Sequence, residues 1–522
     1  MKADSILPSV ADYVLTHMKS HPHRPALVSE QESISYQELG DHVQHVAGEL
    51  LKLGIERGDV VGVITTPRVD SYILALSLNA IGAIWLGINP AYKYAEMDYI
   101  VGDSKPVALF FLSGFEGRSY VDSVWRLTES APSIRHLYSL DQPVENAGFF
   151  QSILNPPSSG TLSLAPALSK RSEDDIAAIV YTSGSSGHPK GCLLPNRAMV
   201  RRALIQIEEY PLKDYPRLYV SLPMNHVGGL QLICTFGMVS GGTLNFRERF
   251  SAEVVGDFVE KCQINFLALV STQYQMIVSN PAFNPLQYKC VEVFFFGGAR
   301  LSKDVILKLK SLGSGRVHTN FGMSETCSSV TCTDPDLDAD TLSNTIGRSL
   351  RGEVRIINPD GEECRVGEVG ELQVKRDNCM TGYLNRPDDT EKVFTSDGWL
   401  KTSDKVELLA DGNIKYIGRN SDAYKSGGYN IDPLEVEACL EEHSNVKTAC
   451  VLGISNEIYG KVGHAIVIAE QGKIVGLEQL REWCKSRISN YKVPKTFEIR
   501  DSLPLLPTKK VDKKTLREEF NL

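Results

Sequence analysis

Hydrophobic and polar positions follow two alternating periods along the first hundred residues. A helical period opens at residues 35–39 and continues through apolar positions three or four residues apart as far as Leu50. Short apolar runs at 59–64 and 84–88 are typical of buried strands, and the apolar segment 75–83 between them is predicted to be helical. This alternation predicts an α/β fold with a parallel sheet and helices on both faces.

Three later apolar runs extend the same pattern. Residues 176–181, 264–270 and 291–296 are predicted to be buried strands, each followed by a polar or glycine-rich turn. The first run ends directly at a loop rich in serine and glycine. Because ligands of parallel α/β sheets bind at the carboxyl ends of the strands, this loop is the first candidate for a binding site.

The pattern of predicted elements changes after residues 414–421. Asp432 is predicted to cap a helix that has Pro433 at its first position, and Glu435 to complete a capping box. Strands are expected at 448–453 and 465–469, and a helix from about Leu477. We therefore expect a large N-terminal domain, residues 1–418, and a small mobile α+β domain, residues 419–522.

Composition narrows the class of protein. A chain of 522 residues is too long for one ordinary core, and a net charge of −9 argues against nucleic acid as a partner. Eleven cysteines without a Cys-x-x-Cys pair favour a reducing compartment, so a cytoplasmic protein is expected. We find neither a secretory signal nor an apolar run long enough for stable membrane insertion.

The loop after residues 176–181 carries the chemistry of a polyphosphate site. It reads Thr182, Ser183, Gly184, Ser185, Ser186, Gly187, His188, Pro189, Lys190. Glycine lets backbone N–H groups approach an anion, hydroxyls donate further hydrogen bonds, and the lysine adds positive charge. The spacing does not fit the Walker A pattern.

This loop resembles the phosphate loop of the adenylate-forming superfamily, which includes acyl-CoA synthetases, amino-acid adenylation domains and luciferases. Further motifs of that superfamily follow in the same order, over roughly residues 30–518: 223–229, 296–300, 320–326, 401–404, 418–419, 425–433 and 503–512. The match is best for the branch of AMP-dependent acid–CoA ligases.

The resemblance implies a role for each motif. Glu325 and Thr182 would hold Mg²⁺, and Lys510 would be the catalytic lysine, together with Glu325 and a gating His226. The residues implied to contact ATP or AMP are Thr182, Ser183, Gly184, Ser185, Ser186, Gly187, Lys190, Gly298, Ala299, Arg300, Asn320, Phe321, Gly322, Met323, Ser324, Asp404, Arg419 and Lys510.

The remaining assignments concern the acid, CoA and the hinge. The resemblance implies an acyl pocket lined by Asn225, His226, Phe296 and Gly298; a bulky ring at Phe296 favours a short or compact acid, although core packing explains it equally well. It also implies CoA binding by Lys425, Ser426, Gly427 and Gly428, and a hinge at Ser421. Ser403, Ser421 and Lys509 depart from the superfamily's usual residues.

The expected reaction has two steps. A carboxylate attacks the α-phosphorus of ATP and releases pyrophosphate; CoA then attacks the acyl-adenylate and releases AMP, so that ATP and CoA are co-substrates and Mg²⁺ is the cofactor. Three alternatives share the fold: an adenylating enzyme for another acceptor such as an amino acid or a carrier protein, a luciferase-like oxygenase, and an inactive nucleotide-binding homologue. The segment 224–227 lacks the aspartate that amino-acid adenylating relatives use, which favours the CoA ligase.

Overall fold

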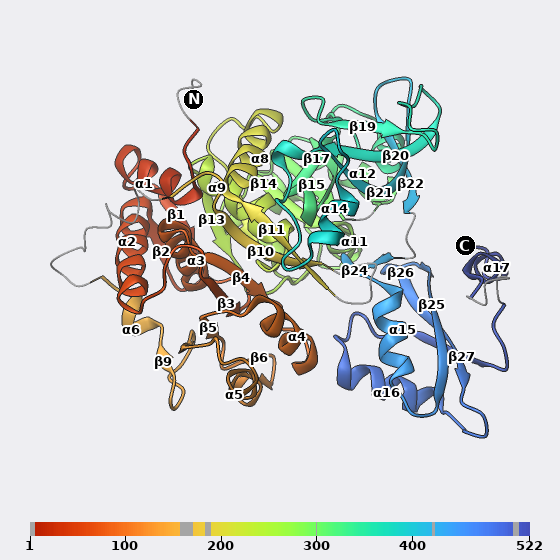
Figure 1. Cartoon of the computed structure of the whole chain (residues 1–522). Coiled ribbons are helices and arrows are strands. Elements are labelled where there is room, and N and C mark those ends of the chain that lie inside the picture. Colours follow the sequence, from red (N-terminus) through yellow and green to blue (C-terminus); the bar gives the residue numbers. More distant parts are fainter. Residues whose placement is uncertain (1–5, 157–170, 183–188, 299, 420–422, 505–510) are drawn as a thin grey trace.

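The computed structural model describes residues 6–156, 171–182, 189–298, 300–419, 423–504 and 511–522. Two large sheets form most of the N-terminal part, and a separate body at the C-terminal end holds a smaller sheet (Figure 1). The predicted α/β fold with a large N-terminal part and a small C-terminal domain is confirmed.

The first large sheet contains the predicted strands of the early chain. Its spatial order is β11 (Lys190–Pro195), β10 (Ile176–Thr182), β4 (Ile84–Ile88), β3 (Val60–Ile64), β5 (Ala108–Phe111), β8 (His136–Ser139) and β9 (Gly148–Phe149). Every pair is parallel except β10 with β11. The connecting helices are α2 (Tyr36–Lys52), α3 (Val69–Ile81), α4 (Tyr94–Ser104), α5 (Val121–Ser130) and α6 (Gln151–Leu154).

Local sequence signals explain where these helices begin and how they pack. Ser35 caps α2, because its hydroxyl accepts a hydrogen bond from the Glu38 N–H while Glu38 bonds back to the Ser35 N–H. Helix α3 starts at Val69, six residues before the predicted segment, and all of its residues are buried. An all-round apolar helix of this kind lies inside a core, and α3 packs against α2 and β4.

The second large sheet is mixed. Its order is β18 (Arg348–Ser349), β17 (Ser328–Cys332), β16 (Val317–Met323), β15 (Val293–Gly297), β14 (Phe266–Val270), β12 (Arg217–Val220), β13 (Thr243–Phe246), β1 (Pro25–Val28) and β2 (Ser33–Ser35). Its helices are α1 (Val10–Ser20), α8 (Asn196–Glu209), α9 (Phe236–Val239), α10 (Val255–Lys261), α11 (Ser271–Ser279), α12 (Lys303–Lys310), α13 (Ala339–Asn344), the π-helix η1 (Gly228–Thr235) and the short turns η2 (Pro285–Tyr288) and η3 (Ser324–Thr326).

A four-stranded antiparallel sheet ends the N-terminal part. It contains β19 (Val354–Ile357), β20 (Val369–Lys375), β21 (Trp399–Leu408) and β22 (Ile414–Arg419), with η4 (Arg376–Asn378) and α14 (Pro387–Val393) inserted before β21. A small hairpin, β6 (Gly114–Phe115) with β7 (Arg118–Ser119), lies elsewhere.

The C-terminal sheet has its own cores. It is built from β24 (Tyr429–Ile431), β23 (Tyr424–Ser426), β26 (Gly460–Ala469), β25 (Val446–Asn456) and β27 (Thr496–Arg500), with α15 (Pro433–Glu441), α16 (Leu477–Arg487) and α17 (Lys513–Glu519). One face of this sheet packs on α15 and α16, and the other packs on Leu503 and Leu516. These separate cores support, as a proposal, a division close to the expected boundary of residues 418 and 419, with Arg419 still the last residue of β22. The expected hinge at Ser421 lies outside the described residues.

One capping prediction is wrong. Asp432 caps α15 as expected, accepting a hydrogen bond from the Leu434 N–H at 2.9 Å, and Pro433 occupies the first turn. Glu435 does not complete a capping box, because its carboxylate instead binds the ammonium group of Lys492 at 2.6 Å. Among the described residues, no helix is long and apolar enough to cross a membrane.

Candidate active site

The expected phosphate loop connects two paired strands. Thr182 is the last residue of β10 and lies opposite Lys190, the first residue of β11. Ser183, Gly184, Ser185, Ser186 and Gly187 lie outside the described residues. The hairpin therefore places the two ends of the loop side by side, at the carboxyl end of a strand that pairs in parallel with β4.

Lys190 is largely buried and held from two sides. It is 9% exposed, and its ammonium group lies 3.1 Å from Asp389 Oδ2. The same group lies over the ring of Tyr383, 5.2 Å from the ring centroid. The lysine at the end of the loop thus has a defined position beside α14, which carries Asp389.

Glu325 lies in the tight turn η3 between β16 and β17. Its side chain is buried, and Oε1 accepts a hydrogen bond of 2.9 Å from the Tyr383 hydroxyl. The Met380 N–H donates to the Glu325 carbonyl at 2.8 Å. The buried Arg202, ion-paired with Glu353, donates to the Thr326 carbonyl at 3.1 Å.

The backbone that follows Glu325 is strained. Cys327 and Ser328 have φ values of 55° and 116°, in the region that L-residues rarely adopt. The Thr326 hydroxyl donates to the Ser328 carbonyl at 2.7 Å and helps to hold this conformation. Strain of this kind persists only where the surroundings fix it, and it clusters at functional sites.

The donor set at Glu325 fits Mg²⁺ bound together with a nucleotide. In the described part of the chain, no group of three His, Cys, Asp or Glu side chains could hold a metal ion alone. Mg²⁺ usually keeps several waters and takes one or two carboxylates plus substrate phosphates. The single buried carboxylate of Glu325 matches that requirement, and Tyr383 connects it to Lys190 at the end of the phosphate loop.

Asp404, Phe321 and Tyr416 form a second group. The Tyr416 hydroxyl donates to Asp404 Oδ1 at 2.8 Å, and the rings of Tyr416 and Phe321 stack with centroids 6.3 Å apart. Asp404 is 1% exposed and lies opposite Arg419 in the β21–β22 pair. The structure thus brings together the residues expected at the adenosine, and adds Tyr416, which the motifs did not single out.

The glycine turn after β15 lies beside β16. A Cβ at Gly297 would lie 2.6 Å from Asn320 Oδ1, so a larger residue there would require the Asn320 side chain to shift. Gly298 has φ 86°, which favours glycine, and the Arg300 Nε donates to the Ser343 hydroxyl at 3.1 Å. Gly322 also lies close to Ser328, on the neighbouring strand. Met323 ends β16, and Ser324 begins η3. Ala299 lies outside the described residues.

The residues expected to line the acyl pocket lie in different surroundings. Phe296 is 1% exposed and packs in a buried cluster with Phe294, as expected for two residues on one side of a strand. Asn225 lies so close to Gly87 that a Cβ there would be 2.6 Å from the Asn225 Cα. The Asn225 Oδ1 atom is buried and has no hydrogen-bond partner in the described part of the chain.

His226 is neutral in this environment. Its Nδ1 accepts a hydrogen bond of 3.0 Å from the Gly228 N–H, which leaves the proton on Nε2 of the neutral ring. Solvent reaches the residue, yet the surrounding protein removes much of its hydration and lowers the pKa of His226 to about 4, with the positive charge of Lys425 acting in the same direction. The ring is therefore uncharged at neutral pH.

Lys425 and its neighbours bring the C-terminal sheet close to His226 and β14. The turn between β23 and β24 contains Gly427 and Gly428, with φ values of 55° and 89°, and its strand residue Ser426 pairs with Gly460. A Cβ at Gly428 would lie 3.2 Å from Val270 Cγ1, at the end of β14. Val270 Cγ1 would also lie 4.0 Å from a Cβ at Gly298, so the segment expected to bind CoA lies beside one residue of the expected acyl pocket. Lys510 lies outside the described residues.

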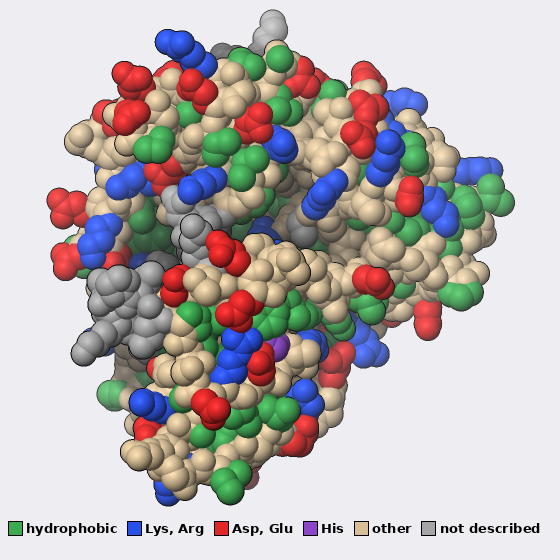
Figure 2. Space-filling model, turned by 90° about the vertical axis from the view of Figure 1, so that its right-hand side faces the viewer, with side chains coloured by type: hydrophobic (Ala, Val, Ile, Leu, Met, Phe, Trp, Pro, Cys, Tyr) green, Lys and Arg blue, Asp and Glu red, His purple; other side chains and the backbone are tan. Residues whose placement is uncertain are grey.

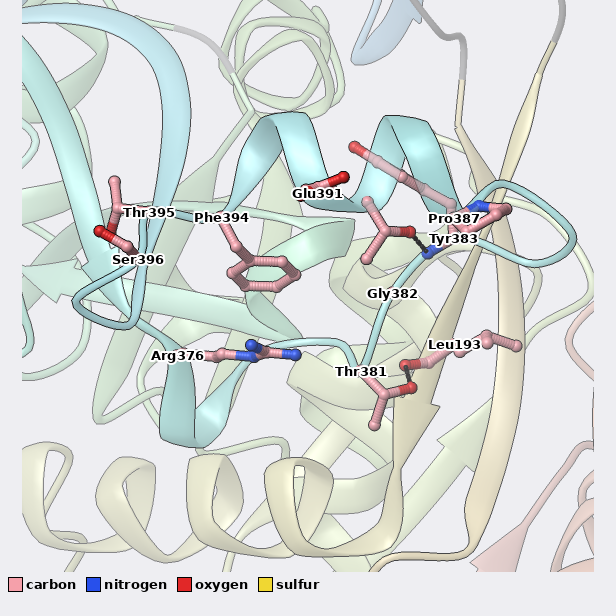
Figure 3. Close-up of a pocket in the computed structure, with 11 residues that line it drawn as sticks. Leu193, Arg376, Thr381, Gly382, Tyr383, Pro387, Glu391, Phe394, Thr395 and Ser396 are labelled. Carbon is pink, nitrogen blue, oxygen red and sulfur yellow. Dashed lines mark hydrogen bonds between the residues drawn. The ribbon is translucent and has the colours of Figure 1, made fainter.

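The face of the molecule on the side of the C-terminal body is hollowed. Viewed from the side of the C-terminal body, a depression separates the upper and lower parts of the molecule, and lysine and arginine side chains stand near its rim (Figure 2). A distinct cavity of about 670 Å³ lies behind Tyr383, between β11 and α14; the ring of Phe394 projects into it above Arg376 (Figure 3). Among the described residues, none of those predicted from the motifs lines that cavity.

Comparison with known proteins identifies the family. Residues 15–384 match the family model described as AMP-binding enzyme, and residues 435–510 match the model of its C-terminal domain. The chain belongs to this adenylate-forming family, as the motifs predicted.

Named relatives support the CoA-ligase branch. The chain is 30% identical to a 2-succinylbenzoate–CoA ligase from Bacillus licheniformis, covering 92% of this chain and 94% of the relative. It is 28% identical to a feruloyl-CoA synthase from Amycolatopsis, covering 96% of each. The predicted class, an AMP-forming acid–thiol ligase that acts through an acyl-adenylate, is confirmed by these relatives.

A solved structure supports the fold. The amide bond synthetase McbA from Marinactinospora thermotolerans superposes with a TM-score of 0.86 at 24% identity, covering 98% of this chain and 99% of that one. At this identity the likeness concerns the fold and carries no information on the acceptor.

Proposed function

We propose that this acid–CoA ligase runs both half-reactions in the cleft between the N-terminal part and the C-terminal sheet. The observation that carries the proposal is the position of the Lys425–Gly428 turn, which lies against Val270 while the charge of Lys425 reaches His226. This position suits the second half-reaction, because glycines at the turn let the thiol-bearing arm of CoA pass close to the backbone.

The first half-reaction requires positioning and charge neutralisation. The substrate carboxylate attacks the α-phosphorus and pyrophosphate leaves. Thr182, Lys190 and the loop between them would hold the phosphates, while Asp404, Phe321 and Arg419 would hold the adenosine. Lys510 would bridge the substrate carboxylate and the α-phosphate.

Mg²⁺ is part of this proposal. Glu325, with Thr182, would hold the ion against the nucleotide, and a bound ion supplies neutralisation of the phosphate charge. The chain's own contribution is the fixed carboxylate, whose orientation is set by the η3 turn and by Tyr383.

The second half-reaction needs the arrangement that the structure adopts. The CoA thiolate attacks the acyl carbonyl, and AMP leaves as the C–O bond to phosphate breaks. The neutral His226 beside Lys425 would line the path of the thiol without adding a positive charge that competes for the adenylate. Exchange between the two half-reactions would occur by rotation about the hinge near Ser421.

The proposed substrate is a ring-bearing acid that carries a hydrogen-bond donor. The names of the two relatives, feruloyl-CoA synthase and 2-succinylbenzoate–CoA ligase, support an aromatic acid. The buried Asn225 Oδ1, without a partner in the described residues, supports a donor such as a hydroxyl, because an unpaired buried acceptor is costly. The cytosol is the proposed compartment, which the eleven free cysteines support.

AMP release from ATP across a panel of acids, each with and without CoA, tests this function. The panel contains ferulate, its methyl ether, 2-succinylbenzoate, and straight-chain acids from acetate to palmitate. We expect CoA-dependent AMP formation and an acyl-CoA product with the aromatic acids, and a preference for ferulate over its ether of about tenfold. Turnover of straight-chain acids alone would refute the substrate class, and turnover without CoA would refute the acceptor.

A further inference from the structure

Tyr383 connects two elements of the proposed ATP site that are far apart in sequence. Its hydroxyl donates to Glu325 Oε1 at 2.9 Å, and the face of its ring lies 5.2 Å from the Lys190 ammonium group. Both Tyr383 and Glu325 are at most 9% exposed. A hydrogen bond between buried partners fixes the rotation of a carboxylate and compensates its lost hydration.

The segment that carries Tyr383 is itself fixed. The Thr381 N–H donates to the Leu193 carbonyl at 2.9 Å and the Leu384 N–H to the Gly191 carbonyl at 2.8 Å, so the segment runs along β11. The Thr390 hydroxyl accepts from the Tyr383 N–H at 2.9 Å and ties the segment to α14 (Figure 3). Tyr383 therefore cannot move without disturbing the strand that begins at Lys190.

Lys190 and Glu325 are held by different partners. Asp389 takes the Lys190 ammonium group at 3.1 Å, and Tyr383 bonds to one carboxylate oxygen of Glu325. The Tyr383 hydroxyl is the donor in this bond, because a carboxylate oxygen can only accept.

We propose that Tyr383 is a positioning residue for the metal-nucleotide site, orienting the Glu325 carboxylate toward the cation bound with ATP and holding the β11 end of the phosphate loop in register with it. The proposal rests on the proposed function of Glu325. Residues that orient a metal-binding carboxylate typically contribute about 10- to 100-fold in metal affinity.

Tyr383→Phe tests this role, because it removes the hydroxyl and keeps the ring that faces Lys190. The measurement is calorimetric binding of ATP to the full-length protein, once with EDTA and once with Mn²⁺ as the probe ion. We expect the Mn²⁺-dependent gain in ATP affinity to shrink by about 10- to 100-fold in Tyr383→Phe. The affinity with EDTA and the melting temperature should match those of the wild-type protein.

Two further variants separate positioning from general damage. Tyr36→Phe is the matched control, because the Tyr36 hydroxyl is also buried and donates at 2.7 Å, to the Gly242 carbonyl, outside the proposed site. It should leave the Mn²⁺-dependent gain unchanged. In the Glu325→Gln background, Tyr383→Phe should cause no further loss, because the two residues act as a unit.

The inference is overturned if Tyr383→Phe keeps the wild-type Mn²⁺-dependent gain, or if it weakens ATP binding equally with EDTA and with Mn²⁺. It is also overturned if the losses in Tyr383→Phe and Glu325→Gln simply add. A wild-type protein whose ATP affinity does not respond to Mn²⁺ would refute the proposed metal site, and the inference with it.

Discussion

Lys492 and Glu96 form an ion pair of 2.7 Å between parts of the chain that are 396 residues apart. Glu96 belongs to α4, and Lys492 follows α16, two helices that lie side by side (Figure 1). The same ammonium group binds Glu435 at 2.6 Å, and the Ser489 hydroxyl donates to Glu96 at 2.8 Å. This buried cluster fastens the C-terminal sheet in the arrangement that places Gly428 against Val270.

We therefore expect Lys492→Met to impair the docked arrangement. The substitution leaves Glu96 and Glu435 buried without their cation, a change that typically costs about 3–5 kcal/mol. Thioester formation from supplied acyl-adenylate should fall by more than about tenfold. Adenylation, which in the proposed mechanism uses another arrangement of the two parts, should change much less.

The control for this prediction is Lys485→Met. Lys485 pairs with Glu482 on the surface of α16, where its side chain is 45% exposed, and such pairs contribute little. A Lys492→Met protein that forms thioester at the wild-type rate would contradict the fastening role. So would equal losses in both half-reactions.

His226 should remain uncharged across the neutral range. Because surrounding protein and then Lys425 lower its pKa to about 4, from an ordinary value near 6.5, the unfolded chain binds a proton between these pH values that the folded protein does not. This contribution to the free energy of unfolding is present above pH 6.5 and is lost as the pH falls through that window. NMR titration of ¹⁵N-labelled imidazoles, assigned with His226→Asn, measures the pKa directly.

Lys425→Met provides the matching test of cause. Removing the nearby positive charge should raise the pKa of His226, whereas Lys473→Met, in an exposed turn of the C-terminal sheet, should leave it unchanged. A wild-type midpoint between 6 and 7, or an equal response to both substitutions, would argue against the described environment.

Ser403 occupies a position that favours glycine. Its φ is 62°, immediately before Asp404, and its N–H donates to Glu371 Oε1 at 3.1 Å. The left-handed conformation costs an L-residue about 1–2 kcal/mol, part of which glycine loses again through the entropy of the unfolded chain. We expect Ser403→Gly to raise the free energy of unfolding by about 0.5–1 kcal/mol.

Urea unfolding measures this effect, with Ser403→Ala as the control. Alanine removes the hydroxyl but retains the strained Cβ, so it should not stabilise the protein. If the Ser403→Gly protein is no more stable than the Ser403→Ala protein, removing Cβ does not relieve strain at this turn, and the interpretation fails.

Local signals in the sequence predicted most of the fold. The strands β3, β4 and β10 and the cap of α15 by Asp432 depend on neighbouring residues, and their residue patterns indicated them. Glu435 satisfied the same local capping rule, yet its side chain binds Lys492, 57 residues away. Tertiary packing brings Lys492 next to Glu435, where it competes with the local cap. No sequence pattern near Glu435 predicts this contact.

The candidate site shows the same limit. The motifs indicated Glu325, Lys190 and Asp404, because each occupies a characteristic position in a motif that resembles the superfamily's. Glu325 lies in the turn after β16, Lys190 at the start of β11 and Asp404 within β21. They did not single out the residues that hold these side chains in place. Tyr383 bonds to Glu325 at 2.9 Å, Tyr416 bonds to Asp404 at 2.8 Å, and Asp389 pairs with Lys190 at 3.1 Å. Glu325 and Tyr383 are 58 residues apart, and only the folded arrangement brings them together.

In the proposed mechanism, Lys510 serves adenylation and the Gly428 turn serves thioester formation. Gly428→Ala introduces a Cβ at φ 89° and 3.2 Å from Val270, whereas Gly472→Ala has a similar φ of 76° with nothing within 4 Å and serves as its control.

The most direct measurement compares adenylation, followed as pyrophosphate release, with thioester formation from supplied acyl-adenylate. We predict that Lys510→Ala slows adenylation by about 100-fold or more and spares thioester formation, and that Gly428→Ala does the reverse. Equal loss of both half-reactions in Lys510→Ala would contradict the account.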